Sequence, residues 1–200
     1  MTTQLLQHRY TAGQSLVYDQ QVSLLIERPG VDPVADLGAV SCTVTVVEVD
    51  ADGAATLELV HRVEEQMTLR PLLTAETTRC RVTPRGEVLS ATPRPPLLPF
   101  VAFPDGQLTL KESWSSVESS GPKRLSMDHT LAVLEPVGDD VYAHVASEGS
   151  AAGDPAIEMY ATRVFSVRLG HLVVGRTVLK YIGSAGDVST LVVEEKVRDL

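Results

Sequence analysis

The sequence predicts an all-β protein: one strongly curved antiparallel sheet of long strands, shaped as a half-barrel or an open barrel. Three observations predict this fold class. Apolar and polar residues alternate with a period of two in several segments, turn residues separate these segments, and no segment shows the apolar spacing of a long helix. The same pattern runs through both halves of the chain, so we expect one domain over residues 1–200.

The clearest strand is expected at Thr56–Arg70. Leu57 and Leu59 fall on one side of an extended chain, whereas a helix would scatter them around its surface. The turn residues Asp50–Gly53 join this strand to a Val- and Thr-rich strand at Ala39–Asp50. Asp and Gly favour a hairpin there because they tolerate the positive φ of tight turns.

The same alternation predicts the other long strands, at Leu16–Ile26, Leu125–Val133, Val141–Ser147, Ile157–Leu169, Leu172–Ile182 and Val188–Val197. Glycine-containing turns and a loop at 149–155 separate several of them. We expect about 9–12 strands, several longer than the usual 5–6 residues. A strand of about 14 residues spans about 45 Å and must twist and coil, which curves the sheet.

A proline-rich crossover at about 91–106 interrupts the strand pattern. Proline cannot donate a hydrogen bond to a strand ladder. The apolar residues of the crossover are too numerous for an exposed linker: Leu97, Leu98, Phe100, Val101 and Phe103. We therefore expect the crossover to pack on the concave face of the sheet or to close it. The alternative is a surface crossover whose apolar residues cover one edge of the core.

The composition excludes several classes of protein. The chain is 44% hydrophobic and 22% charged, which is too apolar for a disordered protein. Its 17 Lys and Arg residues against 26 Asp and Glu give a net charge of -9, so a nucleic-acid partner is not expected. No apolar run approaches the roughly 20 residues of a transmembrane helix. We expect a soluble, acidic, bacterial protein.

The first residues and the cysteines bear on the cellular compartment. The N-terminal residues lack the positive start and apolar core of a secretory leader, so we expect a cytoplasmic protein, or a periplasmic or exported one if a leader has been removed. Cys42 and Cys80 are expected to be reduced, partly buried, small apolar residues.

No catalytic or metal-binding motif is present in the sequence. The nucleophile elbow, the zinc-protease helix and the phosphate-binding loops are missing. The 5 histidines do not have the spacing of metal ligands. We expect no cofactor and no metal.

Several polar residues nevertheless fall on strand faces that should be apolar, among them His61, Glu65, His129 and Arg163. A buried charge must pair, reach water or line a cavity. We hypothesise that Glu65 and Arg163 form an ion pair across the concave face; the alternative is that these residues are satisfied at strand ends. The candidate ligand-binding residues are His61, Glu65, Met67, Trp114, His129, Arg163 and Phe165.

Tyr10–Tyr18, Val44–Leu59, Pro104–Trp114 and Arg124–Glu148 together resemble the opening strand, first hairpin, mid-chain segment and following hairpin of an uncharacterised bacterial all-β family. Lys111-Glu112 stands where that family has Gly-Asp. The family in turn resembles the half-barrel of bacterial lipoprotein carriers. The resemblance implies a groove for a hydrophobic ligand, although fold alone does not carry function.

The sequence favours a non-enzymatic binding protein that holds an apolar or amphipathic ligand, such as a lipid-like molecule or an acyl chain, or a partner peptide, in a concave groove. One alternative is a small enzyme with His61, Glu65 and Arg163 as acid, base and anchoring groups. Another is an assembly protein that forms a homodimer through an exposed strand edge.

Overall fold

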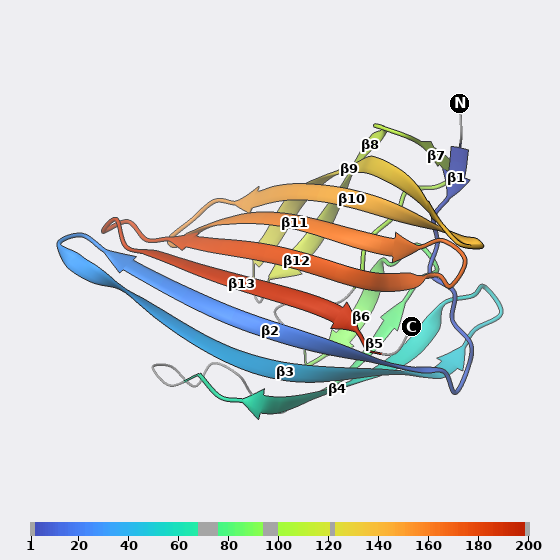
Figure 1. The fold of residues 1–200 in the computed structure, drawn as a ribbon, viewed down its shortest axis with the longest axis horizontal. Helices are drawn as coiled ribbons and strands as arrows, with labels where there is room; N and C mark the ends of the chain where they lie inside the picture. Colours follow the sequence, from blue (N-terminus) through green and yellow to red (C-terminus); the bar gives the residue numbers. More distant parts are fainter. Residues whose placement is uncertain (1–2, 68–75, 94–99, 121–122, 199–200) are drawn as a thin grey trace.

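The structure is a computed structural model that describes residues 3–67, 76–93, 100–120 and 123–198 (Figure 1). Every regular element in these residues is a β-strand, which confirms the predicted all-β fold class. Positions 68–70 of the strand expected at Thr56–Arg70 and positions 94–99 of the crossover lie outside the described residues. Nowhere in the described ranges is there a helix long and apolar enough to cross a membrane.

Within the described residues, eleven strands form one antiparallel sheet in the order β6-β5-β4-β3-β2-β13-β12-β11-β10-β9-β8. Their bounds are β2 Ser15–Arg28, β3 Val31–Val49, β4 Ala55–Glu65, β5 Glu76–Val82, β6 Val88–Thr92, β8 Ser113–Ser120, β9 Lys123–Val137, β10 Asp140–Ala151, β11 Ala156–Ser166, β12 His171–Ile182 and β13 Val188–Val197. Pairing of β2 with β13 joins two meanders, one on each side of this central pair (Figure 1).

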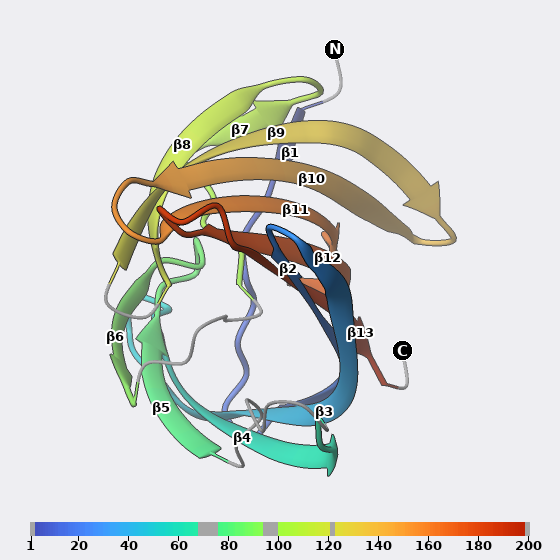
Figure 2. The ribbon, with the colours of Figure 1, turned by 90° about the vertical axis from the view of Figure 1, so that its left-hand side faces the viewer.

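Long, bulged strands curve this sheet, and its concave side holds the buried core clusters; we call the space inside this curve the hollow. β2, β3 and β9 have 14, 19 and 15 residues, and the pairings of β3 with β4, β9 with β10, and β11 with β12 each contain a register shift. Bulges bend a strand and increase its twist. Figure 2 shows the resulting curve of the backbone: β3 and β4 lie opposite β9, β10 and β11. The predicted half-barrel curvature is therefore present.

The alternation of burial identifies the inner face of the sheet. In β11 positions 157, 159, 161, 163 and 165 are buried and are separated by more exposed ones, and the last residue, 166, is buried as well. In β4 the buried positions are Ala55, Leu57 and Leu59, as the period-two pattern predicted. Side chains on this face point into the hollow, because successive residues of a strand point to opposite faces.

The described part of the crossover, residues 100–106, packs on the inner face as expected. Phe100, Val101 and Phe103 are buried among the apolar residues of the sheet. Trp114 donates its indole N–H to the carbonyl of Ala102 at 2.7 Å, which ties the crossover to β8.

A second segment, not expected from the sequence, also crosses the hollow. β1 (Thr3–Leu5) pairs with β7 (Gln107–Thr109) in a separate two-stranded sheet, and the chain then runs across the hollow to β2 (Figure 2). We call residues Leu6–Tyr10 the strap. Leu6 and His8 of the strap are buried, and the main-chain N–H of Arg9 donates to the carbonyl of Gly170 at 3.1 Å.

Two glycines allow the strap to approach its neighbours closely. A Cβ at Gly170 would lie 2.6 Å from the main-chain nitrogen of Arg9. A Cβ at Gly86 would lie 2.0 Å from the carbonyl oxygen of Val101 and 2.8 Å from Nε2 of His8. Both glycines have positive φ, 72° and 83°, which other residues rarely adopt. The strap therefore depends on glycine at both positions.

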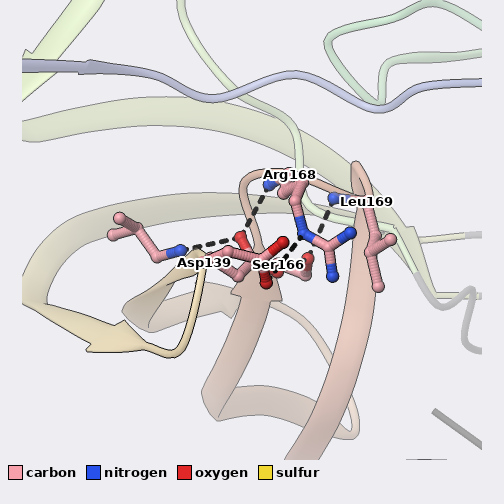
Figure 3. Close-up of polar contacts among 6 residues, drawn as sticks. Asp139, Ser166, Arg168 and Leu169 are labelled. Carbon is pink, nitrogen blue, oxygen red and sulfur yellow. Dashed lines mark hydrogen bonds and ion pairs between the residues drawn. The ribbon is translucent and has the colours of Figure 1, made fainter.

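The turn at the end of β11 contains Ser166, Arg168 and Leu169 (Figure 3), and its Gly170 carbonyl, which accepts the N–H of Arg9, is the strap anchor. Asp140, at the start of β10, holds this turn in place. Its carboxylate accepts hydrogen bonds from the hydroxyl of Ser166 and from the main-chain N–H groups of Val141 and Arg168. The Ser166 oxygen in turn accepts the N–H of Leu169 at 3.0 Å. Burial opposes ionisation of Asp140, but these hydrogen bonds outweigh it and hold the pKa of the carboxyl below its usual value.

Candidate functional site

The end of the inner face opposite the strap is lined by methionines. Two buried clusters meet at Leu191: Met127 and Met159 with Leu125, Ile157, Ala161 and Leu179, and Met67 with Val22, Leu24 and Val193. We call them the methionine clusters, and they hold every methionine of the chain except Met1. Thioether side chains are flexible and polarizable, so this lining can adapt to apolar groups of different shapes.

A glycine makes the space for one of these methionines. Gly149 of β10 pairs with Met127 of β9. A Cβ at Gly149 would lie 2.2 Å from Sδ of Met127 and 2.5 Å from the carbonyl oxygen of Ser126. The backbone of β10 at this position is therefore covered by the Met127 thioether.

A row of polar residues crosses the inner face between the methionine clusters and the strap. The register aligns Arg163 of β11 with Gly175 of β12, Gly175 with Glu195 of β13, and Glu195 with Gln20 of β2. We call these four residues the polar row. Arg163 is 2% exposed and Glu195 is 7% exposed, so two oppositely charged groups lie buried on a largely apolar face.

Gly175 lets the Glu195 carboxylate lie over the middle of this row. A Cβ at Gly175 would be only 2.8 Å from Oε1 of Glu195. The other carboxylate oxygen accepts a hydrogen bond from the side-chain amide of Gln20 at 3.3 Å. Burial raises the pKa of Glu195, and the positive charge of Arg163 and the Gln20 hydrogen bond oppose that rise.

His129 joins three strands through two hydroxyl groups. Its Nε2 lies 2.8 Å from Oγ of Ser116 on β8, and its Nδ1 lies 2.8 Å from Oγ of Ser147 on β10. The indole ring of Trp114 stacks on the imidazole with ring centres 5.3 Å apart. Burial, together with the charge of Arg163, lowers the pKa of His129 to about 4.

This geometry suits hydrogen bonding better than catalysis. A serine beside a histidine is activated only if the imidazole can hold the proton, and a carboxylate on the second nitrogen normally stabilises the charged ring. His129 has a hydroxyl at that nitrogen and a pKa near 4, so it is a weak base at neutral pH. Burial also raises the pKa of Cys42 and Cys80 to about 12, which leaves both thiols protonated.

The structure brings four of the predicted site residues together on the inner face: Trp114, His129, Arg163 and Phe165. Phe103 of the crossover links Phe165 to Trp114, because its ring centre lies 4.9 Å from that of Phe165 and 6.2 Å from that of Trp114. Met67 lies on the same face, in the methionine clusters.

His61 and Glu65 lie apart from this group. His61 is half-buried in β4 beside Cys42 and Glu76, and burial lowers its pKa. The predicted ion pair between Glu65 and Arg163 is wrong. The register of β4 shifts so that Glu65 pairs with Ala39, which turns its side chain to the outer face, where it is exposed.

Glu195 is the acidic residue that faces Arg163 instead, and the sequence analysis missed it. The signal was present in the strand at Val188–Val197: period-two alternation places Glu195 on the same face as Val193 and Val197, both of which are buried. Among the described residues, no group of three or more His, Cys, Asp and Glu is placed to hold a metal ion.

The outer face of the sheet carries a depression of about 740 Å³ over β10 to β13 and parts of β2 and β9. Val133, Val164 and Val174 provide apolar surface in it. At its rim Nε of Arg176 lies 3.1 Å from Oε1 of Glu194, and both side chains are more than half exposed. This ion pair lies on β12 and β13 beside Gly175 and Glu195, but on the opposite face.

Comparison with known proteins adds a distant likeness in structure. No family model matches the chain, and no curated protein sequence is similar to it. Among solved structures, the chain matches the crystal structure of a LolA superfamily protein from Nitrosomonas europaea at 15% identity, over 96% of this chain and 89% of that chain, with a TM-score of 0.23. The match agrees with the weak resemblance found in the sequence, and at this TM-score it carries no argument about function. The chain's own residues carry the proposals that follow.

Proposed function

We propose that the inner face of the sheet binds an apolar or amphipathic molecule, such as a lipid-like compound or an acyl chain. The apolar part of the ligand would lie against the methionine clusters. The observation that carries the proposal is the polar row: Arg163 and Glu195 lie buried in the middle of a largely apolar face.

The energetics of burial support a role for this row other than stability. Removing a charged group from water costs several kcal/mol per ion, and apolar residues of similar volume often stabilise a core as well or better. Sites for small molecules, by contrast, are largely apolar and contain a few placed polar groups that orient the ligand. The polar row has that composition, because Arg163 and Glu195 lie between apolar clusters.

The position of the row also suggests the orientation of an amphipathic ligand. The methionine clusters lie on one side of Arg163 along β11, at Ile157 and Met159. The aromatic residue Phe165 lies on the other side and packs against the crossover. A polar end placed at Arg163 would therefore leave the apolar tail on the methionine side.

Titration of the protein with the apolar dye N-phenyl-1-naphthylamine tests the proposal. Dye fluorescence should rise to saturation, and oleate should displace the dye. Met159→Gln should weaken dye binding by about tenfold, equivalent to about 1.4 kcal/mol. Tyr160→Gln is the matched control, because Tyr160 is the next residue of β11 and points outward, 45% exposed. Equal affinity of the two variants would refute binding on the inner face.

A second pair of variants tests the polar row itself. Arg163→Gln should weaken oleate binding more than dye binding, since only oleate carries a carboxylate. Arg176→Gln removes the corresponding charge from the outer face and should leave both affinities unchanged. If Arg163→Gln weakens both probes equally, the row does not recognise the polar end of the ligand.

A further inference from the structure

A small pocket lies between the strap and the sheet, apart from the polar row. Residues of the strap, β2, β3, β4 and the start of β12 line it, and most of its wall is apolar: Leu16, Val44, Val46, Leu57 and Phe100. Polar residues also line it, among them Tyr10 of the strap and His171 of β12. The centre of a water molecule can move over about 20 Å³ inside this pocket.

Some polar groups around this pocket have hydrogen-bond partners among the described residues, and others do not. Tyr18 donates its hydroxyl to the carbonyl of Leu172, and Nε2 of His8 lies 3.1 Å from the carbonyl of Val101. The hydroxyl of Tyr10 and both ring nitrogens of His171 are buried, and no described residue forms a hydrogen bond of good geometry with them. His171 as a whole is only 8% exposed.

The neutral imidazole of His171 needs a hydrogen-bond donor as well as an acceptor. Burial lowers the pKa of His171, opposed by the nearby carbonyl of Leu169 and the carboxylate of Asp140, so the ring is neutral at pH 7. A neutral imidazole has one N–H donor and one acceptor nitrogen. A carbonyl can accept only from the donor, so the acceptor nitrogen still needs a donor. Burial also raises the pKa of Tyr10, which keeps its hydroxyl protonated.

We propose that this pocket is a binding site for one ordered water molecule, which bridges the hydroxyl of Tyr10 and a ring nitrogen of His171. The size of the pocket favours water over a larger ligand, because roughly 10–15 Å³ of such space is enough for one water. The polar partners favour water over an empty cavity, because dry cavities have apolar linings. The bridging water fastens the strap to the first residue of β12.

A crystal structure at better than about 1.5 Å resolution gives the direct test. Density for a water should lie within hydrogen-bond distance, about 2.6–3.2 Å, of the Tyr10 hydroxyl and of one His171 nitrogen. A pocket without such density overturns the proposal, as does density that fits a larger molecule.

A double-mutant cycle tests the bridge in solution. Tyr10→Phe should lower the folding equilibrium constant about fivefold in the natural chain, and the effect should largely disappear in a His171→Leu background. Tyr160→Phe is the matched control, because it removes an exposed hydroxyl whose hydrogen bond to Glu158 is long, at 3.4 Å, and it should change the folding equilibrium little. An equal effect of Tyr10→Phe in both backgrounds overturns the bridge. If His171→Leu does not fold, the crystal structure decides the question alone.

Discussion

Replacing Arg163 with methionine should destabilise the protein far more than replacing Arg176. Both arginines lie near an acidic residue of β13, but on opposite faces of the sheet. Arg163 is 2% exposed and Glu195 is 7% exposed, whereas the side chains of Arg176 and Glu194 are 56% and 57% exposed. Removing one partner of a buried charge pair typically costs about 3–5 kcal/mol, because the other charge is left buried. An exposed pair is worth about 0–1 kcal/mol.

Urea unfolding at pH 7, followed by the fluorescence of Trp114, measures this difference. Trp114 is the single tryptophan of the chain and stacks on His129 on the inner face, so unfolding should change its emission. With a slope of about 2–3 kcal/mol per molar urea, Arg163→Met should lower the unfolding midpoint by about 1–2 M. Arg176→Met should lower it by less than about 0.5 M.

A double variant separates the polar row from general damage to the core. Arg163→Met combined with Glu195→Leu removes both charges and should recover much of the stability that the single variant loses. If Arg163→Met costs no more than Arg176→Met, the reasoning about burial is refuted. If the double variant is no more stable than the single one, Glu195 is not the charge left uncompensated.

Three further predictions concern the interior. Burial holds the pKa of His8 and of His129 near 4, while unfolded histidines titrate near 6.5, so the unfolded state binds more protons between these values. The contribution of each of these histidines to stability should be constant above about pH 7 and fall by up to about 3 kcal/mol as the pH drops from 6.5 to 4. Thermal melts between pH 7 and pH 4 check this, and an unchanged melting temperature contradicts it. Asp140→Ala removes three hydrogen bonds from the turn that holds the strap anchor and should lower the free energy of urea unfolding by about 2–4 kcal/mol. Asp139→Ala, at an exposed neighbour, should lower it by less than about 0.5 kcal/mol. Equal losses in the two variants would exclude the anchoring role of Asp140. Gly149→Ala places a Cβ against the Met127 thioether and the Ser126 carbonyl and should lower the free energy of urea unfolding by about 1–3 kcal/mol. An alanine variant as stable as the natural chain would show that the space beside Gly149 is larger than described.

The strand pattern was predictable wherever one face of a strand meets the core. The predicted and observed bounds agree at Val188–Val197, where a glycine-containing turn precedes a run rich in valine. β3 begins earlier than predicted, at Val31, although its first residues include two aspartates and Pro33. Pairing with β2 holds that part in the sheet, while its pairing with β4 begins only at Ala39, so Pro33 need not donate a hydrogen bond on that side. Tertiary pairing overrides the local sequence there.

The sequence predicted only part of the candidate site, because the face on which a residue lies depends on the register of its strand. Alternation correctly placed His129, Arg163 and Phe165 on the inner face, because their strands keep a constant phase up to those positions. The same rule failed for Glu65, because a single register shift in β4 reverses the faces beyond it, and no residue type marks that shift. The strap could not be predicted, since its partners lie far along the chain.

The strap also constrains the order in which the segments of the chain can fold. Its first attachment, β1, needs β7 at Gln107–Thr109, and its next anchor needs the carbonyl of Gly170. Residues near the beginning of the chain therefore cannot reach their native positions until segments more than a hundred residues later have folded. Contacts between such distant segments slow folding, because a long loop must close before they form. The hollow of the sheet should accordingly stay open to solvent until late in folding, and its apolar lining is then exposed to other chains.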